Sequence, residues 1–174
     1  MLKLHNLFFL LTFGIALAQP PKMKLTPGGF EPITVTIPST KTDKLVSLTQ
    51  TWVVERDRRS TDPNKKYDIT NVSNNTITVT SFQKNAFYYT DRGEEFEHRI
   101  QYTMKFTFYE NRYYLTFNID QIYTDNNVPL KSGISDFFKN DDTLKEGYTD
   151  LDTSLERTVN DIVLSHYNAL INYR

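Results

Sequence analysis

Cysteine is absent from the 174 residues, so the chain has no disulfide, no thiolate metal ligand, no cysteine nucleophile and no lipidated cysteine. Glycine is scarce, and its only adjacent pair, Gly28-Gly29, lies in a proline-rich stretch, which leaves no glycine-rich loop to cradle a phosphate. No Gly-x-Ser-x-Gly nucleophile motif occurs. A charge excess is also missing, since 20 basic and 21 acidic residues give a formal net charge of −1. This balance argues against a general nucleic-acid binder and against a strongly basic membrane-surface protein.

Hydrophobic and aromatic residues are present in the amounts that a folded domain needs. They make up 39% and 14% of the chain, which is enough to build a core and argues against disorder throughout. The length fits a single domain. After the first eighteen residues no apolar stretch approaches the roughly 20 residues that a membrane-spanning helix requires, so no transmembrane segment is predicted there.

The first eighteen residues have the form of a secretory signal peptide. Lys3 precedes an apolar run over residues 7–17, and Ala16-Leu17-Ala18 places small residues where a signal peptidase reads them. Cleavage after Ala18 would remove Lys3 and change the formal net charge from −1 to −2. The alternative is an N-terminal anchor that is never cut. We therefore expect an exported protein, periplasmic or secreted.

After the first eighteen residues the chain passes from a proline-rich stretch to segments with the patterns of secondary structure. Residues 19–32 contain four prolines and are predicted to form an extended, poorly ordered lead-in. Alternating Ile, Thr and Val predict a short strand at 33–37. Apolar residues at helical spacing predict a helix over 43–56, followed by a charged loop at 57–66. A single domain is expected to run from residue 33 to residue 174.

Strands dominate the middle of the chain. They are predicted at residues 67–72, 76–89, 95–109 and 112–124. Irregular alternation near Ser81-Phe82 suggests a bulge, and Asp91-Arg92-Gly93 suggests a hairpin turn. Even-numbered residues from Phe96 to Phe108 are mostly apolar and odd-numbered ones polar, which is typical of a strand with one packed and one wet face.

The C-terminal part is predicted to cover that packed face. Residues 125–148 read as a long loop with one helical turn around Ile134. A helix is predicted over 151–172, started by a capping box at Thr153 and Glu156, and its apolar stripe needs the sheet as a partner. The fold class is therefore α+β, with an antiparallel sheet of about five strands and two helices.

The candidates for catalysis are weak. His98 lies on the apolar face of the best strand, where a buried or edge histidine with a local hydrogen bond is favoured over a catalytic base. His166, near the end of the last helix, is expected to act as a cation that complements the helix dipole. The acids Glu94, Glu95 and Glu97 lack calcium-loop spacing. No metal, no cofactor and no catalytic residue is predicted.

A binding surface is the stronger hypothesis. Tyrosine and arginine are enriched at interfaces, and the wet face of the sheet carries several such polar and aromatic residues. The alternative is that these polar and aromatic residues have no partner to bind and only stabilise the sheet through cross-strand pairs. The candidate binding residues are Arg99, Gln101, Lys105, Arg112, Tyr114 and Asn118.

The order of strands and helices resembles a family of exported Bacteroidetes proteins. The resemblance covers about residues 40–125 and is clearest in YTMKFTFYENRYYLTFNIDQIY, from Tyr102 to Tyr123, with its Arg112-Tyr113 pair after the turn. That family is a domain of unknown function with a fold like the TATA-box-binding protein. The resemblance implies a curved antiparallel sheet with helices on one side. It implies neither an enzyme activity nor DNA binding.

Three functions remain as hypotheses. The first is a non-catalytic binding module of the bacterial cell envelope, whose wet sheet face holds a peptide, glycan or protein and no nucleic acid. The second is a hydrolase with a dispersed acid–base site at His98 or Glu94–Glu97. The third is a structural envelope component that self-associates through a sheet edge.

Overall fold

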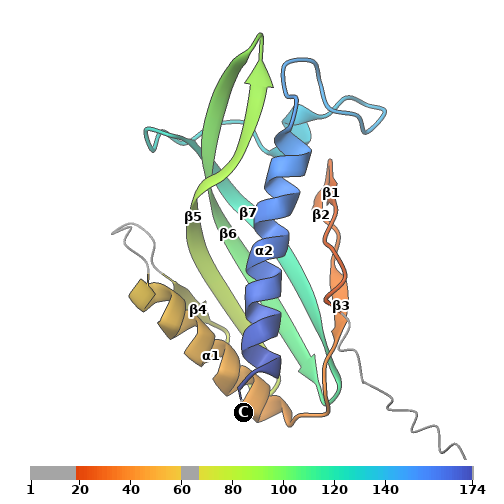
Figure 1. Cartoon of the computed structure of the whole chain (residues 1–174), viewed down its shortest axis with the longest axis vertical. Helices are drawn as coiled ribbons and strands as arrows, with labels where there is room; N and C mark the ends of the chain where they lie inside the picture. Colours follow the sequence, from red (N-terminus) through yellow and green to blue (C-terminus); the bar gives the residue numbers. More distant parts are fainter. Residues whose placement is uncertain (1–18, 60–66, 174) are drawn as a thin grey trace, which may run out of the picture.

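A five-stranded antiparallel sheet with two helices on one face forms the body of the protein (Figure 1). The computed structural model describes residues 19–59 and 67–173, so the predicted signal peptide at residues 1–18 lies outside the described residues. The elements in chain order are β1 (Leu25–Thr26), β2 (Gly29–Phe30), β3 (Ile33–Thr36), α1 (Thr42–Arg59), β4 (Asp68–Thr70), β5 (Thr76–Asp91), β6 (Glu94–Tyr109), β7 (Arg112–Thr124), the 3₁₀ turn η1 (Ile134–Phe137) and α2 (Leu151–Ile171).

The strand order is β3-β7-β6-β5-β4, and every neighbouring pair is antiparallel. The two longest strands, β5 and β6, lie inside the sheet, and the short strands β3 and β4 form its edges. In Figure 1 the strands curve and α2 runs along the sheet, with α1 beside its C-terminal end. The predicted fold class, an α+β protein with a curved antiparallel sheet and two helices on one face, is confirmed. Neither described helix has the length and apolar character needed to cross a membrane.

The alternation predicted for β6 sets the core. Its even-numbered residues from His98 to Phe108 are buried, and Tyr113, Leu115 and Phe117 of β7 continue the same face. Phe96 is the exception, because 39% of it is exposed. The β6–β7 ladder begins only at His98 and Thr124, so Phe96 projects beyond the part of the sheet that β7 covers.

The predicted bulge exists, but its predicted position at Ser81-Phe82 is wrong. Ser81 is buried and pairs in register with Tyr102, and the register shifts only between Gln83 and Phe87. The extra residues include Asn85, whose φ of 50° suits asparagine better than most side chains. The extra residues bend the strand where it leaves the sheet body. The turn at Asp91-Arg92-Gly93 is confirmed, with positive φ at Arg92 and Gly93 as a tight hairpin requires.

The lead-in is not poorly ordered. Residues 25–30 form a small hairpin, and Met23 is fully buried. Asn160 of α2 accepts a hydrogen bond from the Met23 N–H at 2.8 Å and donates one to the Met23 carbonyl at 3.0 Å. Glu156 accepts a third from the Leu25 N–H at 2.8 Å. A proline-rich composition does not reveal these bonds, because their partners lie about 130 residues further along the chain.

The capping box predicted at the start of α2 is wrong as well. The helix begins at Leu151, and its N-cap residue Asp150 makes no side-chain capping bond. Ser154 instead donates to the Tyr88 carbonyl at 2.9 Å and accepts from the Tyr88 N–H at 3.2 Å. The Thr90 N–H donates to Thr149 at 2.9 Å. These bonds occupy the edge of β5 beyond the point where β4 ends.

Asn160→Ala is expected to release the N-terminal segment. It removes both bonds to Met23, and the free energy of unfolding should fall by about 1–3 kcal/mol because buried polar groups lose their partner. Urea unfolding measures the change, and limited proteolysis should show faster cleavage within residues 19–32. The control is Asn168→Ala on the exposed side of the same helix, which should change the stability by less than about 0.5 kcal/mol. Equal effects of the two substitutions would contradict this role.

Candidate functional site

The face of the sheet away from the helices is open. Between the turn of β6 and β7 and the β5 bulge, the residues that point to it are exposed or half-buried, whereas those on the helix-covered face are mostly buried. Neither described helix packs over it. Threonines fill much of it, with Thr80 and Thr103 hydrogen-bonded to each other at 2.9 Å and Thr103 donating to Asp120 at 2.6 Å. All six candidate residues predicted from the sequence project from this face.

Four of the six candidates lie on the part of the open face between its middle, at Asn118, and the β6–β7 turn. Lys105 pairs with Thr116 across the strands, so Tyr114 and Asn118, two residues before and two residues after Thr116, are the diagonal neighbours of Lys105. Arg112 lies two residues before Tyr114 and places its guanidinium 5.1 Å from the centre of the Tyr109 ring. We call Lys105, Tyr109, Arg112, Tyr114 and Asn118 the basic aromatic patch.

Tyr109 was missed among the sequence-based candidates. It is 45% exposed, about as much as Tyr114 at 41%. It lies opposite Arg112 in the β6–β7 ladder. The signal was available, because Tyr109 is the next odd-numbered residue after Thr107 in the same alternating strand.

Arg99 and Gln101 lie at the other end of the open face, and both already bond to other residues of the chain. Arg99 forms an ion pair with Asp125 at 3.0 Å and donates to Asn127 at 3.1 Å. Gln101 accepts a hydrogen bond from the Tyr123 hydroxyl at 3.3 Å. The structure therefore separates these two candidates from the basic aromatic patch. Arg99 holds the segment that follows β7, and Gln101 bonds to β7 itself.

A groove of about 700 Å³ lies beside the β5–β6 hairpin, where β6 extends past the end of β7. His98 lines it together with aromatic residues from three parts of the chain, among them Tyr89, Phe96 and Tyr148. The Tyr89 ring stacks on Phe96 at 5.3 Å and on His98 at 5.1 Å. The Tyr148 ring meets Tyr89 edge-on at 4.9 Å.

His98 is buried with a local hydrogen bond, as predicted. Its Nδ1 lies 3.0 Å from the Phe96 carbonyl, so Nδ1 carries the proton of the neutral ring. Desolvation lowers the pKa of His98, and the Phe96 carbonyl raises it only partly back. Within the described chain no carboxylate, serine or threonine hydrogen-bonds to this ring. Among the described residues, His98 is therefore not paired with a hydroxyl nucleophile or with a carboxylate.

The predicted role of His166 as a cation at the helix end is wrong. The side chain is fully buried, and desolvation lowers its pKa to about 3. Thr49 donates to the Leu45 carbonyl at 2.9 Å and therefore accepts from the His166 Nε2–H at 3.0 Å. The ring lies 4.2 Å from Phe106 and 5.1 Å from Trp52. His166 is thus a neutral member of the aromatic core, because its face of α2 is the one turned to the sheet.

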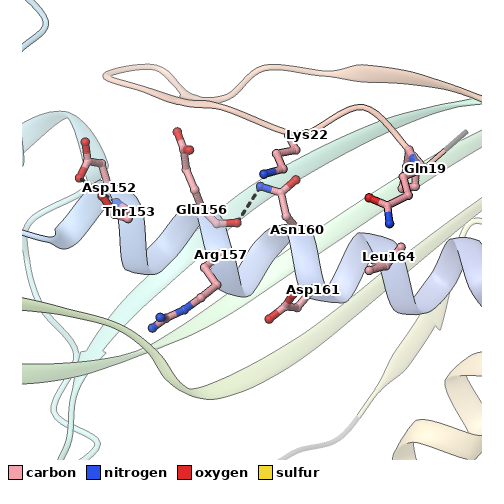
Figure 2. A pocket seen from close by; sticks show the side chains of 10 residues that line it. Gln19, Lys22, Asp152, Thr153, Glu156, Arg157, Asn160, Asp161 and Leu164 are labelled. Atoms are coloured by element: carbon pink, nitrogen blue, oxygen red, sulfur yellow. Dashed lines mark hydrogen bonds between the residues drawn. The ribbon is translucent and has the colours of Figure 1, made fainter.

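A further hollow lies between the N-terminal segment and the outer side of α2 (Figure 2). Lys22 and Gln19 come from the segment, and Arg157 and Asp161 come from the helix. The side chains of both charges are mixed there, and Asn160 is held by the Glu156 carbonyl at 2.7 Å. In residues 19–59 and 67–173 no three His, Asp or Glu side chains gather as a metal site would require.

Comparisons with known structures support the fold. A DUF4468 family protein from Bacteroides ovatus aligns with a TM-score of 0.54 at 11% identity, covering 90% of this chain and 89% of that one. A TBP-like protein from Parabacteroides distasonis aligns with a TM-score of 0.53 at 15% identity, covering 80% and 90%. The chain has a TBP-like fold. Both neighbours fit the predicted resemblance to a Bacteroidetes domain of unknown function. No protein-family profile and no curated protein matches the sequence. The TBP-like fold by itself carries no function.

The buried neutral His166 makes stability depend on pH. Because its folded pKa is about 3 and the unfolded value about 6.5, protons bind preferentially to the unfolded chain between these values. The free energy of unfolding should be unaffected by this group above pH 7 and fall by up to about 1.4 kcal/mol per pH unit between about pH 6 and pH 4. Urea unfolding across this range measures the slope. His166→Phe should reduce it, whereas an unchanged slope would contradict the role of His166.

Proposed function

We propose that this protein is a non-catalytic binding module of the bacterial cell envelope and that it binds its partner through the basic aromatic patch. The observation that carries the proposal is the asymmetry of the sheet. One face is closed by α1 and α2, and the opposite face is open and presents two exposed tyrosines beside Arg112 and Lys105.

The patch has the properties of a preorganised contact surface. Its side chains stand on paired strands, so little backbone entropy is lost on binding. Arg112 is already stacked on Tyr109, which limits the rotamers of both. Tyrosine and arginine are the residue types that contribute most to binding at interfaces. A peptide, a glycan or a protein surface that offers hydrogen-bond acceptors or negative charge fits this chemistry.

Self-association through a sheet edge is less well supported. The edge strands β3 and β4 have only four and three residues, and short edges offer few unpaired backbone groups. The outer side of β5 beyond β4 is covered by Ser154 and Thr149. A hydrolase is not favoured either, since His98 has no acid–base partner among the described residues.

Export is the second part of the proposal and is supported by the sequence alone. Lys3, the apolar run at 7–17 and Ala16-Leu17-Ala18 have the order of a secretory signal. A chain without cysteine tolerates an oxidising compartment without side reactions of free thiols. The near-neutral charge gives no support to a nucleic-acid partner.

The double substitution Arg112→Ala, Tyr114→Ala tests the patch. Tagged residues 19–174 would be used to capture partners from cross-linked source cells, and retained proteins and glycans would be identified by mass spectrometry. We expect the double variant to keep its thermal unfolding midpoint. The amount of partner that it retains should fall at least about tenfold, because interface Arg and Tyr contribute about 1–2 kcal/mol each to binding.

The matched control is Arg157→Ala, Tyr173→Ala, which removes the same two exposed residue types from the helix side of the molecule. It should bind the partner as the unsubstituted protein does. Retention of the partner by the Arg112→Ala, Tyr114→Ala variant, or equal loss by both variants, would count against the patch.

N-terminal sequencing of the protein from fractionated source cells tests export. We expect recovery from the periplasm or medium, with Gln19 as the first residue. Recovery from the envelope with residues 1–18 still attached would indicate the uncleaved anchor. Recovery from the cytoplasm would contradict the proposed location in the cell envelope.

A further inference from the structure

The groove beside the β5–β6 hairpin has features that neither the core nor the basic aromatic patch requires. His98, Tyr89, Phe96 and Tyr148 line it, and so do Glu95 and Glu97. It lies beyond the end of β7, on a different part of the molecule from the basic aromatic patch. The groove is therefore a separate surface from the one proposed above to bind the partner.

The first observation is a histidine nitrogen that pairs with no described residue and that solvent can reach. His98 is 5% exposed, and its Nδ1 is occupied by the Phe96 carbonyl at 3.0 Å. Its Nε2 has no hydrogen-bond partner among the described residues, and the ring lines the groove. Since Nδ1 holds the proton, Nε2 presents a lone pair that can accept a hydrogen bond from solvent or from a ligand in the groove. Desolvation keeps the pKa of His98 low, so the lone pair is available at neutral pH.

Aromatic rings next to His98 are the second observation. Phe96, Tyr89 and His98 form a continuous stack, with 5.3 Å and 5.1 Å between successive ring centres. Phe96 is 39% exposed, although it stands on the apolar face of its strand. Exposed aromatic surface beside an acceptor suits a ligand that has an apolar portion and a positive charge.

The charge around the groove is the third observation. Glu95 and Glu97 are exposed and form no ion pair within the described chain. Asp125 also lines the groove, but its charge is offset by Arg99 at 3.0 Å. No lysine or arginine in residues 19–59 and 67–173 lines it. The local field is therefore negative and complements a cation.

We propose that this groove binds an organic cation that carries N–H donors, namely an amine or a guanidine. The ligand donates one N–H to His98 Nε2. Its alkyl portion lies against Phe96 and Tyr89. Glu95 and Glu97, whose side chains leave the opposite face of the same strand, attract its positive charge through the local field. The group comes either from a free small molecule or from a lysine or arginine side chain of a peptide.

Nuclear magnetic resonance of the two histidine rings tests the site directly. Folded residues 19–174 would be titrated at pH 7.5 with n-butylamine and n-butylguanidine, with 1-pentanol as an uncharged probe of similar size. The His98 ring signals should shift and saturate with the two cations and respond at least about fivefold more weakly to 1-pentanol. His166 is an internal control, because it is fully buried and should not respond.

Two charge-neutralised variants distinguish an effect of the carboxylates at the groove from an effect of the protein's net charge. Glu95→Gln, Glu97→Gln should weaken butylguanidine binding by at least about fivefold. Glu31→Gln, Asp161→Asn removes the same number of exposed charges elsewhere and should leave the binding unchanged. All four substituted positions are exposed, so loss of folding is not expected. His98→Gln should abolish the binding in a variant whose thermal unfolding is checked first.

Comparison of n-butylamine with the tripeptide Gly-Lys-Gly distinguishes a free ligand from a peptide side chain. Tighter binding of the peptide indicates a side chain, and tighter binding of the amine indicates a free ligand.

Three results would each overturn the proposal. They are no saturable shift of His98 with either cation, an equal response to 1-pentanol, and equal weakening by the two charge-neutralised variants.

Discussion

Burial of one aromatic face of β6 under α2 is the constraint on which the rest of the structure depends. With no disulfide available, the fold is held by packing, and the residues from His98 to Phe108 need a cover. Helix α2 supplies it along the length of the sheet (Figure 1). His166 faces the sheet near the C-terminal end of α2 and stays neutral, because ionisation there would place a charge among Phe106, Trp52 and Tyr113.

The same helix organises the periphery through polar side chains. Asn160 and Glu156 hold the N-terminal segment, and Ser154 covers the edge of β5. On the neighbouring side, Ser165 accepts hydrogen bonds from Trp52 and Arg56 and so joins α2 to α1. One helix therefore covers the core, protects a strand edge and fixes the chain that enters the domain. These contacts leave the opposite face of the sheet uncovered.

The uncovered face and the hairpin end present two different chemistries. The basic aromatic patch offers cations and tyrosines, and the groove at His98 offers carboxylates, aromatic rings and a lone pair. Arg99 lies between the two surfaces. Its ion pair with Asp125 offsets the positive charge of Arg99 near the groove. The likeness to TBP-like structures, at 11% and 15% identity, describes the scaffold alone and carries no function.

The sequence by itself determined the strands, the hairpin turns, the side of β6 that is buried and the candidates on its wet face. These features follow from a period-two pattern and from turn residues, which are local properties of the chain. Only the tertiary structure decided that Met23 is a core residue, that the bulge lies at Asn85, that His166 is neutral and that Arg99 is engaged. Each of these depends on which distant segment lies against the residue, and a local pattern does not specify that partner.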